Sequence, residues 1–596
     1  MGDKQEFVVD EKSSLSRFRW RIAEADERLV AAISERCRLP DVVAKIIAAR
    51  GVPLDKVGDY VSPSIKKLLP DPYKLKDMEK AAARIEAAIL KGETIGIFGD
   101  YDVDGATAAA VLYKFLSDAG AKKIHIHIPD RQSEGYGLNS DGLKELFGKG
   151  CTLVVAVDCG ITGFDAVEMA AAMGLDIVVA DHHEAEAGIP EAAAVVDPKQ
   201  VDDESGLNYL AACGVVFLLA VALNRRLRGS GFYRKSGAAE PDLFSYLDLV
   251  ALGTVCDVVP LVGVNRAFVA AGIKVMQKRQ NIGLKALCDI SGVSAPPTVF
   301  HLGYVLGPRI NAGGRVGNSL IGAQLLTTRN PLTAENLATR LNNFNTERKD
   351  IEAAVLSEAF EIIAREIKPD DNFIFIAGKN WHTGVIGIIA GRIKERYSLP
   401  TLVATVDGNG IANGSGRSIP EIDLGSAIIK AKEQGILIEG GGHSMAAGFT
   451  LRIERAGEFK EFLRGYIEKS TSSRKIVPVL RIDSVIDIAG INNDLVNKLA
   501  VLEPFGTANE EPRFAVMNAK LSGADAIGGG NVRCYFSSDN GRSVSAICYK
   551  AIGTAIGEAL LSKVGERFKI AGKIRANEWN GRRYLQFVVD DAAPAQ

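Results

Sequence analysis

The stretch TIGIFGDYDVDGATAAAVLYKF, residues 94–115, carries a short β-rich run through three acidic residues into an alanine-rich helical run. Four more short apolar runs alternate with helical stretches after it, at 124–128, 153–157, 176–180 and 193–196. This alternation is typical of βαβ units on a parallel sheet. The sequence therefore predicts an α/β fold, with a parallel-sheet domain over residues 76–330.

Acidic residues follow most of these runs. An Asp comes directly after the run, or within two residues of it, at Asp100, Asp130, Asp158 and Asp181. In an open α/β sheet the ligand crevice lies beyond the carboxyl ends of the strands. We therefore expect these acids to collect at one edge of the sheet.

The segment DYDVDG is the strongest chemical signal. Asp100, Asp102 and Asp104 alternate, and in extended backbone alternate side chains point the same way. Three carboxylates in one crevice raise one another's pKa unless a cation neutralises them, which favours a metal site. The alternative is a turn in which one acid caps the following helix and the other two are solvated.

Further candidate ligands lie downstream. They are Asp158 in VAVDCGITG, His182 and His183 in VVADHHE, and Asp257 in GTVCDVVPL. Carboxylates with one or two imidazoles suit Mn²⁺ or Mg²⁺ better than a thiolate zinc site does. We expect Cys159 and Cys256, which adjoin these acids, to be packing residues.

The rest of the chain divides into four parts. Residues 1–75 form a mostly helical lead-in, 331–369 a long connecting helix capped by Asn330, 370–470 a smaller α/β domain, and 476–596 an all-β domain resembling an OB-fold. The connecting segment could also be two helices broken near residues 342–343. In RRYLQFVV (582–589) alternation places Tyr584 and Phe587 on opposite faces, so only one set of side chains can be exposed for base stacking.

Composition limits the function classes. The 596 residues carry 71 basic and 73 acidic side chains, so a polyanion would need a local patch. The longest apolar run, residues 209–223, is too short to span a bilayer. Eight cysteines without a C-x-x-C pair fit a reducing setting. These features predict a cytoplasmic protein with no membrane partner.

Seven ordered motifs resemble a known family. DYDVDG, VDCG, ADHHE and GTVCDVVPL resemble the four motifs of the DHH phosphoesterase superfamily, and NWHTGVIG, GSGRS and GGHSMAAG resemble its DHHA1 domain. With VLEPFGTANEEPRF and the C-terminal β-domain, nearly the whole chain is similar to the bacterial RecJ family. The resemblance implies a single-strand-specific 5′→3′ DNA exonuclease that acts in recombination and repair.

The resemblance also implies a set of catalytic residues. Two divalent ions, Mn²⁺ or Mg²⁺, would share Asp158; Asp100 and Asp102 would complete one site, and Asp104, His182 and Asp257 the other. Such a pair hydrolyses phosphodiesters without a protein nucleophile. His183 would face the scissile phosphate, and Asp181 would support an imidazole unless it caps the next helix.

Substrate-binding residues are expected on glycine-rich segments. LGPRINAGGR should be a loop that presents Arg309 and Arg315, and GSGRS a phosphate cradle of Ser415, Arg417 and bare glycine amides. The resemblance adds His443, together with Arg131 and Tyr136 for the terminal phosphate and first nucleotide.

Other functions remain open at this point. An enzyme for very short oligonucleotides or cyclic dinucleotides is the main rival, followed by a soluble pyrophosphatase and a non-catalytic nucleic-acid binder. The last is disfavoured because all the expected acids are present. The expected partner is single-stranded DNA; the resemblance adds a single-strand-binding protein and a helicase, and a monomer is sufficient.

Overall fold

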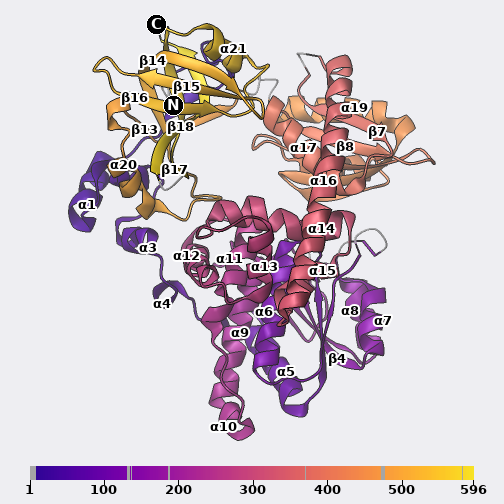
Figure 1. Ribbon diagram of the computed structural model, residues 1–596. Coiled ribbons are helices and arrows are strands. Elements are labelled where there is room, and N and C mark those ends of the chain that lie inside the picture. The colour runs from indigo at the N-terminus through magenta and orange to yellow at the C-terminus, as the bar shows by residue number, and fades with distance from the viewer. Residues whose placement is uncertain are drawn as a thin grey trace. The chain divides into compact units, whose positions relative to one another are not determined.

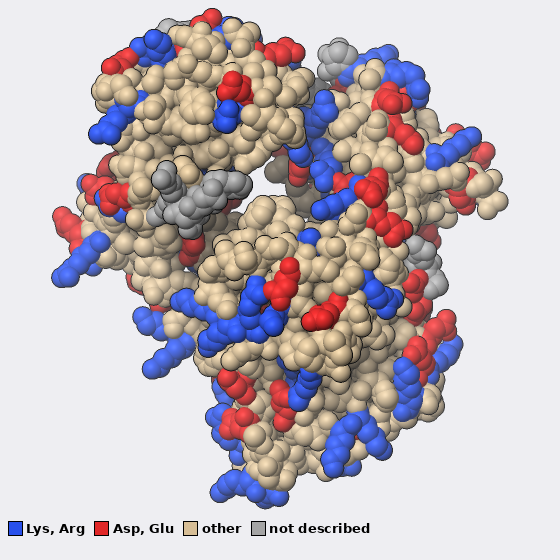
Figure 2. Space-filling view, viewed as in Figure 1, with Lys and Arg blue, Asp and Glu red and all other residues tan. Residues whose placement is uncertain are grey.

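The computed structural model describes residues 8–130, 134–135, 137–185, 188–368, 371–471, 477–579 and 582–595, without the side chains of 578, 579, 582 and 583. The chain divides into two compact units. One is Leu69–Lys475, and the other combines Met1–Leu68 with Ile476–Gln596. Lys, Arg, Asp and Glu side chains are interspersed over the visible face in Figure 2, in line with the balanced composition.

The first sheet contains the five predicted strands. These are β2 (Thr94–Gly99), β3 (Ile124–His127), β4 (Cys151–Val157), β5 (Asp176–Ala180) and β6 (Ala194–Val196). All are parallel, in the order β3-β2-β4-β5-β6. Helix α5 (Met78–Lys91) precedes the sheet, and the crossover helices are α6 (Val103–Asp118), α7 (Ser140–Gly148) and α8 (Phe164–Ala172) (Figure 1). The predicted α/β architecture is confirmed.

A group of helices follows this sheet. It comprises α9 (Ala212–Gly229), α10 (Phe232–Ser236), α11 (Leu247–Cys256), α12 (Gly263–Gln277), α13 (Ile282–Ile290), a π-helix (His301–Leu306), α14 (Gly307–Val316) and α15 (Leu320–Thr327). Most of the long apolar run lies in α9, which is buried. Among the described residues no helix has the length and apolar character needed to cross a bilayer.

The connecting segment is one continuous helix, α16 (Pro331–Glu366), which Figure 1 shows as the long rod of this unit. Asn330 is its N-cap and accepts a hydrogen bond from the Thr333 amide at 3.2 Å. No break occurs near residues 342–343, because Leu341 and Asn345 are both buried on the inner face. The prediction of a single long helix is therefore confirmed, and the alternative of two shorter helices is wrong.

The second α/β domain has a five-stranded sheet. Its strands are β7 (Ile374–Lys379), β8 (Thr401–Val406), β9 (Ile411–Arg417), β10 (Glu439–His443) and β11 (Ala446–Arg452), in the order β10-β11-β9-β8-β7. The helices are α17 (Thr383–Tyr397), α18 (Leu424–Glu433) and α19 (Ala456–Ser470). Strand β9 pairs with a neighbour on both sides.

The other unit is built on a β-barrel. Its sheet runs β13 (Ser484–Val485), β14 (Arg513–Ile527), β15 (Asn531–Ser537), β16 (Ser543–Cys548), β18 (Arg582–Pro594), β17 (Arg567–Trp579), and β14 also pairs with β17, which closes the barrel. The helices α20 (Asn493–Leu499) and α21 (Ala555–Ser562) are inserted between strands. Phe536 and Phe587 lie in the core, whereas Tyr535 and Tyr584 are exposed, as the alternation in RRYLQFVV predicts for the last strand.

The N-terminal lead-in belongs to the core of this same unit. Strand β1 (Arg19–Ile22) pairs in parallel with β12 (Val479–Ile482). Side chains of α1 (Glu27–Cys37) and α2 (Asp41–Ala49) share one apolar cluster with the barrel strands, and α3 (Val57–Val61) and α4 (Ile65–Leu68) follow. The first and last parts of the chain thus form one hydrophobic core.

Candidate active site

The acids at the carboxyl ends of the first sheet come together. Asp100 follows β2, Asp158 follows β4 and Asp181 follows β5, and all three are buried. Asp158 has a φ of 61°, and Val258, next to Asp257, a φ of 63°. A left-handed conformation is costly for these residues, above all for β-branched Val258, and such strain is concentrated at functional sites.

The DYDVDG segment differs from the expected extended alternation. Helix α6 begins at Val103, and Asp102 is its N-cap, with Oδ1 accepting a hydrogen bond from the Gly105 amide at 3.0 Å. One acid therefore caps the helix, as the alternative reading held, but Asp100 and Asp104 are buried rather than solvated. The helical turn sends Asp100 and Asp102 to one side, toward Asp158, and Asp104 to another.

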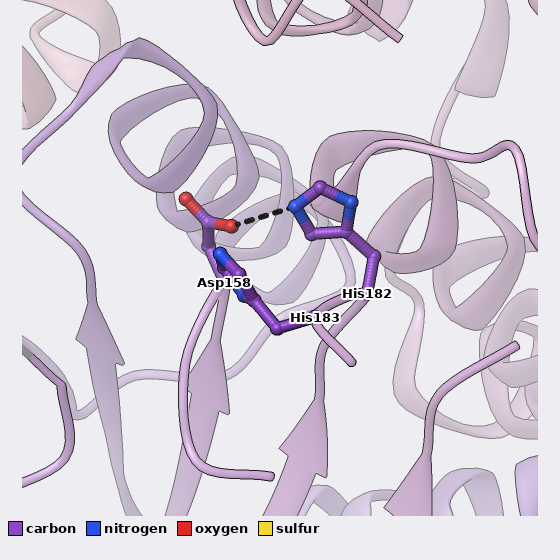
Figure 3. A group of neighbouring side chains, drawn as sticks. All are labelled: Asp158, His182 and His183. Atoms are coloured by element: carbon purple, nitrogen blue, oxygen red, sulfur yellow. Dashed lines mark ion pairs between the residues drawn. The ribbon is translucent and has the colours of Figure 1, made fainter. Parts of the chain in front are cut away.

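Three groups of side chains place their ligand atoms within 4.8 Å of one another. They are Asp100, Asp102 and Asp158; Asp104, His182 and Asp257; and Asp158, His182 and His183. His182 Nε2 lies 3.3 Å from Asp158 Oδ1, 3.6 Å from Asp257 Oδ2 and 3.8 Å from Asp104 Oδ2 (Figure 3 draws the first of these pairs). Neighbouring ligands of an octahedral ion with bonds of about 2.1 Å lie about 3 Å apart, so these spacings are close to a coordination shell.

The His182 ring is oriented for coordination. Its Nδ1 lies 3.1 Å from the Leu210 carbonyl oxygen, which makes Nδ1 the protonated nitrogen and leaves the Nε2 lone pair toward the acids. Burial, and then the charge of His183, lowers the pKa of His182 to about 4. The ring is therefore neutral at pH 7, which is the form that binds a metal.

The electrostatics of the acids also favour a cation. Burial, and then the charge of Asp102, raises the pKa of Asp104 to about 6 and those of Asp100 and Asp158 well above their ordinary range. Burial, and then Asp104, raises the pKa of Asp257 to about 9. Asp100 Oδ1, His182 Nε2 and Asp257 Oδ2 are buried without a hydrogen-bond partner in the described part of the chain. A divalent ion would neutralise these acids and satisfy these atoms, so the donor set fits Mn²⁺ or Mg²⁺.

His183 has a different environment. Its Nδ1 lies 2.7 Å from Asp181 Oδ1. Burial alone would lower the pKa of His183, but this hydrogen bond and the charge of Asp181 outweigh it and raise the pKa to about 9. Asp181 also accepts hydrogen bonds from the amides of Ile161 and His182, and no helix begins among the described residues directly after it. Asp181 is therefore a support for an imidazole and not a helix cap.

The arginines of LGPRINAGGR lie on a helix, not on the expected loop. Arg309 and Arg315 belong to α14. The loop prediction was wrong because the glycines pack closely: Gly314 lies against the Tyr101 backbone, and Gly313 against Asn318. Arg315 Nη1 donates to the Gly384 carbonyl at 2.7 Å, which ties this helix to NWHTGVIG in the second domain.

The GSGRS segment is a strand whose amides are not bare. Ser415 and Arg417 lie on β9, between two hydrogen-bonded neighbours, so the predicted cradle of glycine amides is wrong. The side chains do come together, since Arg417 Nη1 donates to Ser415 Oγ at 3.0 Å. His443 is in register with Ala446, which is in register with Arg417 across β10, β11 and β9. Arg131 and Tyr136 lie outside the described residues.

Two features of the site were missed from the sequence. Asp197 directly follows β6, is fully buried, and has an Oδ2 atom with no hydrogen-bond partner among the described residues. Burial, and then the charge of Asp181, raises its pKa to about 7. The signal was available, because Asp197 follows its strand as Asp158 and Asp181 follow theirs. The amides of Ala212 and Cys213 donate hydrogen bonds to Asp104 at 2.6 and 3.0 Å. No sequence pattern predicted these two contacts.

Comparison with known proteins agrees with this arrangement. Family models match residues 94–254 (DHH family, N-terminal domain), 370–469 (DHHA1 domain) and 482–591 (RecJ OB domain). The single-stranded-DNA-specific exonuclease RecJ of Bacillus subtilis is 32% identical over 98% of this chain and 71% of its own length. The chain belongs to the RecJ family.

Solved RecJ structures share the fold. RecJ from Thermus thermophilus in complex with Mn²⁺ matches with a TM-score of 0.79 at 27% identity, covering 97% of this chain and 80% of that one. The Mg²⁺ complex matches with a TM-score of 0.74 at 26% identity, covering 97% and 78%. The predicted order of DHH domain, long helix, DHHA1 domain and OB domain is thus that of a RecJ protein.

Proposed function

We propose that this chain is a metal-dependent exonuclease that degrades single-stranded DNA from its 5′ end. The observation that carries the proposal is the convergence of Asp100, Asp102 and Asp158 on one side and Asp104, His182 and Asp257 on the other. The relatives named above are single-stranded-DNA-specific exonucleases, and the Thermus protein binds Mn²⁺ and Mg²⁺. The 5′ polarity rests on the family resemblance.

The two ligand groups would hold two divalent ions, with Asp158 shared between them. Such ions lower the pKa of a water and stabilise the leaving oxygen of an in-line displacement at phosphorus. The chain's own residues orient the ligands: Leu210 holds His182, and the amides that open α9 hold Asp104. No side-chain nucleophile is needed.

His183 supplies a positive charge beside the reacting phosphate. Because its pKa is about 9, the imidazole is protonated at pH 7. Asp181 holds that proton at Nδ1, so the ring is fixed in orientation. An imidazolium in this place would stabilise the negative charge that develops on a phosphoryl oxygen.

The second domain supplies the anion-binding side chains. Arg417 and Ser415 lie on β9, and His443 lies on β10 in register with Arg417 across the intervening strand β11. Gly387 of α17 lies against Arg417 and Ser415. Arg315 connects α14 to the same helix. We assign these residues, with Arg309, to the phosphates of the bound strand, and Arg131 and Tyr136 to its 5′ end.

The remaining assignments follow the resemblance. A role in DNA recombination and repair, a single-strand-binding protein and a helicase as partners, a monomeric state and a cytoplasmic location belong to this proposal. The boundaries expected for the five parts of the chain, including a separate lead-in over 1–75, stay predictions as well.

Digestion of end-labelled DNA tests the proposal. Single-stranded DNA labelled at either end is incubated with Mn²⁺ or Mg²⁺, beside duplex DNA and RNA. A 5′ label should be released at once as a small product, while a 3′ label remains on strands of decreasing length. Loss from the 3′ end would refute the polarity, and equal attack on duplex would refute strand specificity. Preference for very short oligonucleotides over long strands would support the rival enzyme class.

A further inference from the structure

The segment that precedes α14 presents two large aromatic rings to solvent. Phe300 is 56% exposed and Tyr304 is 75% exposed. Their rings stack with centroids 5.3 Å apart and planes 25° from parallel. Rings exposed to this degree add little to the burial of apolar surface, so fold stability does not account for the pair. We call Phe300 and Tyr304 the aromatic pair.

The local helix explains why the pair points outward. Leu302 and Leu306 are fully buried and hold the segment to the domain. Phe300 and Tyr304 have the same spacing of four and occupy the opposite face. The segment His301–Leu306 is a π-helix. This form is rare in proteins, and where it occurs it is often part of a functional site.

The π-helix that carries Tyr304 packs against the end of α11 that leads into Asp257. Cys256, the last residue of α11, places its Sγ atom 3.4 Å from the Leu302 carbonyl oxygen. A Cβ on Gly307 would collide with the same Sγ atom. The π-helix therefore packs directly on the residue that precedes a candidate metal ligand. Val258, on the other side of Asp257, is also exposed.

A basic side chain accompanies the pair. Arg309 Nη1 donates to the Val305 carbonyl at 2.7 Å, and its Nε donates to Asn342 Oδ1 at 3.0 Å. Val305 directly follows Tyr304, so the guanidinium is held at the backbone of the same helical segment that carries the rings. Proteins that bind single strands combine aromatic faces, on which bases stack, with basic groups that contact the phosphates.

We propose that the aromatic pair is a stacking platform for nucleobases of the single strand just outside the catalytic centre. This inference rests on the proposed function, since it takes the strand to approach beside Asp257. Stacking would be tolerant of sequence, because every base has a π-face. The platform would hold the strand while its terminal nucleotide is hydrolysed.

An abasic scan tests the platform. Binding of the full-length protein to short oligothymidines is measured in EDTA, with a single abasic residue moved along the strand. We expect the abasic residue to weaken binding about tenfold at one or two positions. In the double variant Phe300→Ala, Tyr304→Ala the intact oligonucleotide should bind about tenfold more weakly, and the abasic penalty at those positions should disappear.

Two matched variants serve as controls. Phe244→Ala removes an equally exposed ring, at 56%, from the short helix Leu243–Tyr246 at the other end of α11, and should leave binding unchanged. Tyr304→Phe keeps the ring and should bind as the unsubstituted protein does. An abasic penalty that persists in the double variant overturns the platform, as does the absence of any position-dependent penalty in the unsubstituted protein.

Two further results have separate meanings. If the double variant changes sedimentation but not DNA affinity, the pair is an interface between copies and the platform is overturned. Failure of the proposed function can be distinguished from failure of the platform. The proposed function fails if end-labelled DNA is not cleaved in Mn²⁺, whereas the platform is tested by binding alone. The abasic scan requires no cleavage.

Discussion

The backbone carbonyl of Leu210 lies 3.1 Å from Nδ1 of His182, and this contact decides which nitrogen of the ring faces the acids. Ala212 and Cys213, two and three residues further along the chain, donate their amide hydrogens to Asp104. One short stretch, which leads into α9 and includes its first two residues, thus orients two candidate ligands of the same ion. Because a helix N-terminus attracts negative charge, the same stretch also favours ionised Asp104.

Replacing Asp158 with Asn should abolish cleavage and leave DNA binding intact. Asn keeps the shape of the side chain and tolerates the left-handed backbone at this position. Removing one of several repelling buried carboxylates should raise the thermal stability of the metal-free protein. Mn²⁺ should stabilise the unsubstituted protein more than the variant in thermal melts. Asp165→Asn, at an exposed acid in the first turn of α8, is the matched control. Retained cleavage in Asp158→Asn would exclude the shared-ligand role.

The stability of the metal-free protein should fall as pH rises from 6.5 to 9. The pKa values of Asp257 and His183 are both about 9 in the folded protein, above the ordinary values of 3.8 and 6.5. In this window the folded protein therefore binds protons that the unfolded chain releases, and raising the pH favours unfolding. The lowered pKa of His182 acts in the opposite direction, but only below 6.5. Urea unfolding at several pH values measures the slope, which saturating Mn²⁺ should reduce. A stability that rises over this window would contradict the assignment.

Asp181→Asn should lower the pKa of His183 toward its ordinary value. The ion pair at 2.7 Å is the main interaction that raises it. Proton titration of the imidazole by NMR in the metal-free protein measures the shift. Loss of a residue that supports an active-site imidazole costs about 10- to 100-fold in activity. A loss of activity without a change in the pKa of His183 would show that Asp181 acts only on the local backbone.

Trp20→Phe should destabilise the barrel unit by about 1.5–3 kcal/mol, the range for a hydrogen bond to a charged group. Trp20 Nε1 donates to the buried carboxylate of Asp591 at 2.7 Å, and Ser14 Oγ donates to the same oxygen at 2.5 Å. Phe keeps most of the apolar packing of the ring. Proteolysis of residues 476–596 in increasing urea reports the change, and an unchanged midpoint would mean that the Trp20 hydrogen bond adds nothing to stability.

A fragment of residues 69–475 should fold and cleave short single strands, whereas residues 1–475 should aggregate. In the longer fragment the apolar faces of α1 and α2 lose the barrel strands against which they pack. Light scattering and circular dichroism distinguish the two fragments. The fragment of residues 69–475 should bind long strands more weakly than the full chain, because the OB domain is missing. Equal solubility would show that the lead-in does not depend on the barrel.

The sequence alone determined the parallel sheet, the long helix, the order of domains and the identity of the acids and histidines that converge. These depend on local periodicity and on the rule that parallel strands end at one edge, both of which can be read along the chain. Tertiary structure decided how the three acids of DYDVDG are oriented, because a helix that begins at Val103, with Asp102 as its N-cap, replaces the expected extended strand. It also turned LGPRINAGGR into a helix and GSGRS into a central strand, since glycines there make room for neighbouring backbone and side chains rather than for a ligand. The union of the first 68 residues with the barrel depends on contacts between the two ends of the chain, which no local pattern records.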